Sequence, residues 1–197
     1  MTARENPFST DRVERVRYWL EGDAWDGLLE RLAVLGNRGA IVGPAGSGKT
    51  TLIEDLIPHL ARRGFRPVLV RAAEESAARP DPEPRDFILL DSAERLGLRA
   101  WLAFRWRVRA ARGLIITAHR PGRLPTLHRC VTSLDLLDRI VERLVPADAA
   151  GLRPLTAELY SRRDGNLRAA LGDLYDLYAA PKGTGTSVHF ALRATGQ

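Results

Sequence analysis

The sequence has few of the features that would place the protein outside the cell or in a membrane. It contains one cysteine, Cys130, so an internal disulfide and a cysteine-based metal cluster are both excluded. No apolar run approaches the roughly 18 residues of a membrane-spanning helix, and the polar segment 1–10 lacks the apolar core of a signal peptide. The single cysteine is typical of a cytoplasmic protein. With 45% hydrophobic residues, the chain is expected to form one or two small globular domains.

Lysine is also scarce, although the chain is basic. Only Lys49 and Lys182 accompany a large number of arginines, and the net charge is +6 with a pI near 10.2. This charge favours an anionic partner, and nucleic acid is one candidate. The alternative is that GC-rich coding accounts for the arginines and that they are solvated surface residues. A lysine within a glycine-rich segment stands out in such a chain.

The middle of the chain alternates short apolar runs with segments of helical periodicity. The apolar runs predict strands at 39–42, 67–70, 87–91 and 113–117, with a short fifth strand near 130–133. Helices are expected at 11–20, 23–35, 49–63 and 96–111. Continuous apolar strands that alternate with helices predict a parallel sheet covered by helices on both faces.

From Leu134 onward only helical periodicity remains. The segments LDLLDRIVERL (134–144), TAELYSRR (156–163) and LRAALGDLYDLYAA (167–180) are separated by Pro146, by Pro154 and by Gly165–Asn166. This pattern predicts a small helical domain. The end of the chain is rich in glycine and is expected to be a flexible tail or arm.

A phosphate-binding loop is predicted between the first strand and the helix that follows it. The stretch Gly43-Pro44-Ala45-Gly46-Ser47-Gly48-Lys49-Thr50, followed by Thr51, matches G-x-x-x-x-G-K-[ST]. The glycines allow successive backbone N–H groups to surround phosphate oxygens, and the helix directs its positive N-terminus at the same phosphates. Lys49 is expected to reach the β- and γ-phosphates and the Thr50 hydroxyl to bind Mg²⁺. A buried strand before the loop and an amphipathic helix after it favour a nucleoside triphosphate site over an ordinary glycine turn.

An acidic residue at the end of a neighbouring strand would complete such a site. FILLD (87–91) ends in Asp91, which is predicted to hold Mg²⁺ together with Thr50. The alternative role of Asp91 is to cap the helix that follows.

The order of the motifs resembles the AAA+ ATPases, especially the clamp-loader, origin-binding and transposition-regulator branches. An N-K-x-D box for guanine and the L-S-G-G-Q signature of ABC ATPases are both missing. The resemblance covers about residues 6–180 and adds three segments to the loop and Asp91, namely GLIITAHRP (113–121), RLPTLHRCVTS (123–133) and GNLRAAL (165–171). It implies ATP and Mg²⁺ as ligands and a fold with a five-stranded parallel α/β P-loop domain (1–134), a helical lid (135–181) and a tail (182–197).

The same resemblance implies roles for three further residues. Thr117 is similar to the polar sensor 1 at the end of the fourth strand, with His119 as the alternative. Arg129 corresponds to the arginine finger that reaches the nucleotide of a neighbouring subunit, although His128 stands where the family has serine. Arg168 corresponds to sensor 2, the lid contact to the γ-phosphate. In each case the alternative is a structural strand residue or a surface arginine.

The residue that follows Asp91 departs from the family pattern. The family has a glutamate there that polarises the attacking water, whereas this chain has Ser92, with Glu94 two residues further on. Serine is not a useful general base without help. Nucleotide binding is therefore expected, whereas hydrolysis is expected to be slow and depends on whether Glu94 can supply the base.

Two aromatic segments remain ambiguous at this level. WLAFRWRVRAAR (101–112) could bind nucleic acid, but packing of Trp101, Leu102 and Val108 on the sheet is favoured. YWLEGDAW (18–25) could contact adenine, but core packing is again favoured.

The sequence thus predicts an ATP-dependent switch, active as a homo-oligomer with sites at subunit interfaces, that engages a protein or nucleic-acid partner and no membrane. A non-hydrolysing ATP-binding adaptor and a small P-loop kinase are the alternatives.

Overall fold

The computed structural model describes residues 6–18, 20, 24–72 and 82–180, and these group into two compact units. The first, the sheet unit, takes the described residues within 17–44 and 48–130. The second, the helical unit, takes those within 1–16, 45–47 and 131–197. The predicted tail at 182–197 lies outside the described residues.

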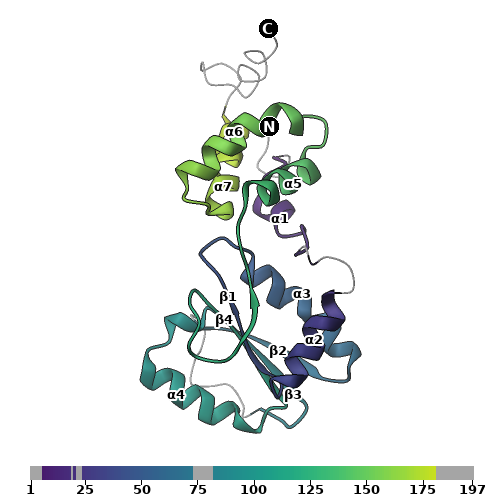
Figure 1. Ribbon diagram of the computed structural model, residues 1–197, viewed down its shortest axis with the longest axis vertical. Coiled ribbons are helices and arrows are strands. Elements are labelled where there is room, and N and C mark those ends of the chain that lie inside the picture. Colours follow the sequence, from purple (N-terminus) through teal and green to yellow (C-terminus); the bar gives the residue numbers. More distant parts are fainter. Residues whose placement is uncertain (1–5, 19, 21–23, 73–81, 181–197) are drawn as a thin grey trace. The chain divides into compact units, whose positions relative to one another are not determined.

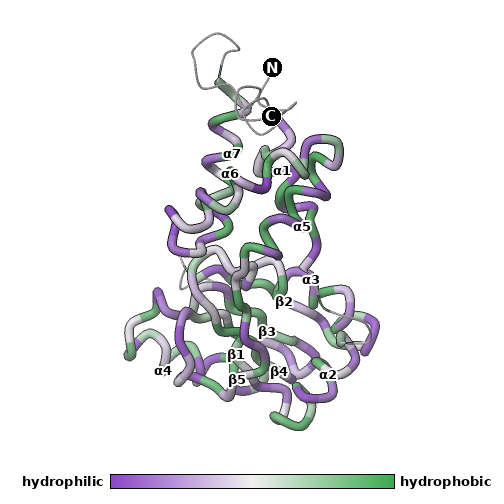
Figure 2. Tube along the Cα trace, turned by 45° about the horizontal axis from the view of Figure 1, so that its top comes forward, coloured by the Kyte–Doolittle hydropathy of each residue, from purple (hydrophilic) through white to green (hydrophobic). Residues whose placement is uncertain are grey.

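The sheet unit is built on a five-stranded sheet in which every strand pair is parallel. The strand order is β2-β3-β4-β1-β5, formed by β1 (Arg38–Val42), β2 (Arg66–Arg71), β3 (Asp86–Asp91), β4 (Gly113–Ala118) and β5 (Thr126–Arg129). Every residue of β3 and β4 is buried, and hydrophobic residues are concentrated in these central strands (Figure 2). The predicted five-stranded parallel α/β fold is confirmed by this topology, and burial along the whole of β3 and β4 fits strands that are covered on both faces.

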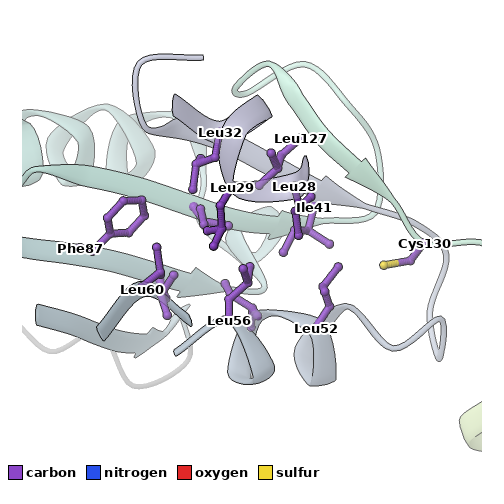
Figure 3. Close-up of a cluster of buried hydrophobic side chains, with 13 residues drawn as sticks. Leu28, Leu29, Leu32, Ile41, Leu52, Leu56, Leu60, Phe87, Leu127 and Cys130 are labelled. Atoms are coloured by element: carbon purple, nitrogen blue, oxygen red, sulfur yellow. The ribbon is translucent and has the colours of Figure 1, made fainter. Parts of the chain in front are cut away.

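Helices cover both faces of this sheet (Figure 1). On one face, α2 (Ala24–Val34) and α3 (Lys49–Arg62) pack leucines and isoleucines against β1, β3 and β4. Figure 3 shows this cluster, in which Leu52, Leu56 and Leu60 of α3 approach Ile41 and Phe87. On the other face, α4 (Leu98–Arg107) buries Trp101 and Phe104. The short 3-10 segments η2 (Ala93–Arg95) and η3 (Val108–Ala110) flank α4.

A glycine at the start of β4 allows an aromatic ring to fill the first of these clusters. A Cβ at Gly113 would lie 2.2 Å from the ring of Phe87, which is a closer approach than atoms can make. Phe87 is fully buried and meets Phe65 edge to face, with 5.2 Å between the ring centroids. Any side chain at position 113 would therefore displace this ring from the core.

The helical unit has its own hydrophobic core. Its helices are α1 (Thr10–Val13), α5 (Leu134–Leu144), α6 (Ala149–Arg162) and α7 (Leu167–Ala179). Phe8 is buried among leucines of α5–α7 and meets Tyr178 edge to face at 5.0 Å. Side-chain caps begin two helices: Ser133 accepts from the Leu136 N–H and Asn166 accepts from the Ala169 N–H.

Several element boundaries differ from the prediction. The fifth strand is Thr126–Arg129 rather than 130–133; it is an outer strand with one buried residue, so its sequence lacks a continuous apolar run. The first helix is a single turn. Pro154 lies inside α6 and does not separate two helices. Within the described ranges, none of the helices combines the length and apolar character required to cross a membrane.

Candidate functional site

The predicted phosphate loop joins the carboxyl end of β1 to the first residue of α3. Gly46 and Gly48 have φ angles of +72° and +80°, a region that residues with a Cβ rarely adopt. Lys49 is buried, and its Nζ donates to the carbonyl oxygens of Gly43 and Pro44 at 2.8 and 2.7 Å. Burial lowers the pKa of Lys49, while the negative charges of Glu94 and Asp91 partly offset that effect. The ammonium group is thus held over the start of the loop among oxygen acceptors.

Three oxygen-bearing side chains meet at the carboxyl edge of the sheet. The Thr50 hydroxyl donates to the Asp91 carboxylate, with distances of 3.3 Å to Oδ1 and 3.2 Å to Oδ2. The Thr117 hydroxyl donates to Asp91 Oδ1 at 2.6 Å. The cluster forms because β3 and β4 are neighbouring parallel strands and α3 begins at the same edge. It brings together the predicted metal residues, Thr50 and Asp91, and the predicted sensor Thr117.

The backbone turns sharply after Asp91. Ser92 has a φ of +61°, which is uncommon for a residue with a Cβ. Its N–H donates to the Thr117 hydroxyl at 2.7 Å. The chain then enters η2, so the residue after Asp91 is held by a hydrogen bond of its backbone. Nothing in the serine side chain signals this conformation at the level of sequence.

Glu94 occupies a partly buried position in η2. Its Oε1 lies 3.2 Å from Nε2 of His119, whereas Oε2 is buried and has no hydrogen-bond partner among the described residues. Glu94 is the strongest of the neighbouring charges that raise the pKa of Lys49. A carboxylate oxygen with unused acceptor capacity therefore lies in the same electrostatic environment as the phosphate-loop lysine. His119, the alternative sensor, pairs with Glu94 instead of Asp91.

Tyr18 contacts the phosphate loop, and the sequence analysis did not predict this contact. Its ring packs against the loop, so that a Cβ at Gly48 would lie 3.1 Å from it. The Tyr18 hydroxyl lies 3.1 Å from Nε2 of His128, and its backbone N–H donates to Asp55 at 2.7 Å. Burial raises the pKa of Tyr18, which keeps the phenol protonated. The only hint in the sequence was an aromatic-rich segment far from the loop along the chain.

The other aromatic positions have packing roles. Trp25 stacks on His59 with 4.2 Å between ring centroids. Trp101 and Val108 are buried on the sheet, as favoured by the sequence, but Leu102 is exposed and Phe104 takes its place in the core. Leu102 was misplaced because α4 presents Trp101 and Phe104, three positions apart, to the sheet.

Arg129 and Arg168, the two arginines with predicted roles, occupy different environments from each other and from Arg123. Arg129 is exposed at the end of β5, an outer strand of the sheet, beside Val42 of β1. Arg123 donates to the carbonyl oxygens of Ala93 and Leu96 and is therefore engaged within its own chain. Arg168 is exposed and is the second residue of α7 in the helical unit.

The arrangement fits the ligands that the sequence predicts. Mg²⁺ prefers hydroxyl, carboxylate and water oxygens, and the Thr50 hydroxyl and Asp91 carboxylate already lie within hydrogen-bond distance of each other. The glycine-containing loop and the start of α3 supply backbone N–H donors, and Lys49 supplies a cation. These groups can bind a polyphosphate together with a divalent cation. Among the residues described, none forms a cluster of three or more His, Cys, Asp or Glu side chains suited to a metal.

Comparisons with known proteins identify similar folds but no family. No protein-family model and no curated protein matches the sequence. Structures of NtrX from Brucella abortus are similar to this chain, with a TM-score of 0.53 and 16% identity over 90% of this chain. Further NtrX structures in complex with ADP and with ATP give TM-scores of 0.53 and 0.50, at 16% and 15% identity. The alignments cover only 53–55% of the NtrX chain, so this chain spans about half of that protein's length. At this level of identity the similarity establishes the fold.

Proposed function

We propose that the chain is an AAA+-like ATP-binding protein that acts as a nucleotide-driven switch. The observation that carries this proposal is the convergence of Thr50, Asp91 and Thr117 beside the phosphate loop. A glycine turn that merely joins a strand to a helix has no need of a metal-binding acid at the end of the neighbouring strand. The NtrX complexes with ADP and ATP support the proposal, because a similar fold binds these nucleotides there.

Each group has a distinct task in this proposal. The loop from Gly43 to Gly48 holds the β- and γ-phosphates through its backbone N–H groups, and Lys49 neutralises their charge. Thr50 and Asp91 would hold Mg²⁺, and the ion would offset the negative charge that develops on the phosphates during transfer. Thr51 follows as the third residue of α3. Thr117 donates to one oxygen of Asp91 and so fixes the orientation of the carboxylate.

The switch requires a response to the γ-phosphate. From the family resemblance we propose that Arg168 contacts this phosphate and that Arg129 reaches the nucleotide of a neighbouring subunit. The exposed position of Arg129 on an outer strand supports a role outside its own chain. In this proposal ATP promotes a homo-oligomer, and that form engages a protein or nucleic-acid partner.

Glu94 is the proposed general base for slow hydrolysis. Two observations support this role: Oε2 of Glu94 is buried without a hydrogen-bond partner among the described residues, and the charge of Glu94 raises the pKa of Lys49. Ser92, in contrast, donates its backbone N–H to Thr117. The second candidate function is a non-hydrolysing ATP-binding adaptor. The pairing of Glu94 with His119 favours it, because a base that is already engaged is slower to accept a proton from water.

Thermal unfolding with and without ATP·Mg²⁺ tests the central proposal. A ligand that binds only the folded state raises the melting temperature, and Lys49→Ala is expected to abolish that rise because it removes a charge-assisted bond to phosphate. Lys182→Ala, which removes the other lysine, is the matched control. An equal rise in wild type and Lys49→Ala would show that the nucleotide binds elsewhere or not at all.

A further inference from the structure

The outer face of α4 carries a hydrophobic stripe that is exposed among the residues described by the structure. Leu98, Leu102 and Trp106 are 71%, 53% and 69% exposed, and they account for three of the five large hydrophobic residues found exposed in the described part of the chain. Their spacing of four residues places them along one side of the helix over about two turns, a length of roughly 12 Å. Isolated exposed hydrophobic residues are ordinary, but an aligned row indicates a contact surface.

The same helix buries its opposite side in the core. Trp101 and Phe104 are 4% and 2% exposed and pack under the sheet with Val108. The fold therefore already uses α4 as an amphipathic helix, and the Leu98–Trp106 stripe is an additional apolar side. Leaving two leucines and a tryptophan in water brings the isolated chain no stabilisation, since their burial would contribute favourably.

The segment that carries the stripe is basic. Residues 95–112 contain six arginines and no acidic residue. Arg99, Arg105 and Arg109 on this segment are exposed. An apolar row accompanied by positive charges is complementary to an apolar row accompanied by acidic side chains. The positive charges disfavour basic partners by charge repulsion.

The structure argues against nucleic acid as the occupant. Stacking on bases needs open aromatic faces, and Trp106 is the only exposed aromatic of the stripe. The guanidinium of Arg109 lies 4.0 Å from the Trp106 ring centroid and so covers one face of the ring. Leu98 and Leu102 offer a base neither stacking nor hydrogen bonds, whereas they suit the side chains of a helix packed alongside.

We propose that the stripe Leu98–Leu102–Trp106 is a docking surface for an acidic amphipathic helix of a partner protein. The partner's apolar residues pack along the stripe, and its glutamates or aspartates pair with Arg99, Arg105 and Arg109. Tryptophan and arginine, here Trp106 and Arg109, are among the residue types that contribute most to binding at protein interfaces. The surface belongs to the sheet unit alone and does not rest on the nucleotide proposal.

Binding of designed peptides to the full-length chain tests this surface. A fluorescent helical peptide of about 16 residues carries leucine at helical spacing and glutamate elsewhere. One comparison peptide replaces each glutamate by lysine, and another keeps the composition but shuffles the leucines. Fluorescence anisotropy is expected to show the acidic patterned peptide binding at least about tenfold more tightly than either comparison peptide.

Substitutions then locate the binding surface. Leu98→Ser with Leu102→Ser is expected to weaken binding of the acidic peptide by about tenfold or more, whereas Val34→Ser, at an exposed valine of α2, should leave it unchanged. Arg105→Glu with Arg109→Glu should shift the preference toward the lysine peptide. Circular dichroism and ATP binding by the same variants show whether the fold and the nucleotide site are intact.

Three results would overturn the proposal. The first is equal binding of the acidic and lysine peptides, or no binding of either at high micromolar concentration. The second is a leucine variant that keeps wild-type affinity for the acidic peptide. The third is that the leucine substitutions instead abolish binding to a DNA oligonucleotide or dissociate a homodimer in light scattering, which would assign the stripe to nucleic acid or to a second copy of this chain. None of these results bears on whether the phosphate loop binds ATP.

Discussion

The Thr117 hydroxyl donates a 2.6 Å hydrogen bond to Asp91 Oδ1, which joins the ends of two neighbouring strands at the candidate site. The same hydroxyl accepts the N–H of Ser92 at 2.7 Å. One buried side chain therefore fixes both the orientation of the proposed metal acid and the turn that follows it. Because Thr117 is fully buried, this geometry is set before any ligand arrives, which reduces the cost of ordering the site on binding.

Removing this hydroxyl without changing the side-chain shape should affect both stability and ligand binding. Thr117→Val leaves the Ser92 N–H without its acceptor and Asp91 without a donor, so we expect a loss of about 1–3 kcal/mol in the free energy of unfolding. Mg²⁺-dependent ATP binding should weaken as well. Urea unfolding and titration with ATP at several Mg²⁺ concentrations measure the two effects. Thr117→Ser keeps the hydroxyl and is expected to retain most of both; if it behaves like Thr117→Val, the hydrogen bonds are not the cause.

The proposed base should be separable from the binding residues. Glu94→Gln keeps the size of the side chain but removes the negative charge, so we expect ATP affinity to remain and phosphate release to fall by about 10²–10⁴-fold. Glu30→Gln, at an exposed position of α2, is the matched control. Phosphate release under single-turnover conditions is the measurement.

The same assay distinguishes the two positions after Asp91. If Ser92 occupied the water-facing position, Ser92→Glu would raise turnover and Glu94→Gln would have little effect. That outcome would remove Glu94 from the mechanism. Turnover that is undetectable in both wild type and Ser92→Glu would favour the non-hydrolysing adaptor.

An ion pair at the first residues of β2 and β3 should make the free energy of unfolding depend on pH in the acidic range. Arg66 donates to Asp86 through its guanidinium, with 3.0 Å from Nη2 to Oδ2, and the Glu83 N–H donates to the same oxygen at 2.9 Å. These contacts lower the pKa of Asp86 below its ordinary value. The ionised form is therefore favoured in the folded state, and its contribution is complete above the unfolded pKa and lost as the pH falls through the lower folded pKa.

Comparison of wild type with Asp86→Asn isolates this contribution. At about pH 7 the variant should unfold at lower urea, with a loss of about 1 kcal/mol, and the difference should shrink as the pH falls below about 4. Asp135→Asn removes an exposed pair with Arg139 on α5 and should change stability little at either pH. A difference between wild type and Asp86→Asn that stays constant down to pH 2–3 would show that the carboxylate charge is not responsible.

The sequence predicted the parts of this fold that depend on local pattern. The central strands β3 and β4 are buried at every position because helices cover both faces, so the apolar runs within them were visible without a structure. The phosphate loop was visible because Gly46 and Gly48 are needed where φ is positive. Asp91 followed from its place at the end of a buried strand.

The remaining features depend on contacts between distant parts of the chain. The strand β5 lies at an edge with one buried residue, so no apolar run marked it. Tyr18 reaches Gly48 from thirty positions away, and nothing in its own neighbourhood specified that contact. The positive φ of Ser92 accompanies a hydrogen bond from its N–H to Thr117, which is distant in the sequence. Leu102 was assigned to the core because periodicity alone cannot choose between two apolar sides of α4.

The proposed site should be completed by a second subunit. Lys49 is the cation that the phosphate loop itself supplies, and Arg123 is engaged with a carbonyl oxygen of its own chain. An arginine finger typically contributes about 10³–10⁵ in rate by stabilising the charge of the transferring phosphoryl group. Arg129, exposed on an outer strand, is the candidate for this arginine.

We expect Arg129→Ala to keep ATP affinity and lose turnover, whereas Arg143→Ala on α5 should have no effect on either. Mixing Arg129→Ala with Lys49→Ala should restore part of the activity, because each variant supplies the residue that the other lacks. Light scattering should show an oligomer that forms with ATP·Mg²⁺, and a protein that stays monomeric at full turnover would exclude completion in trans.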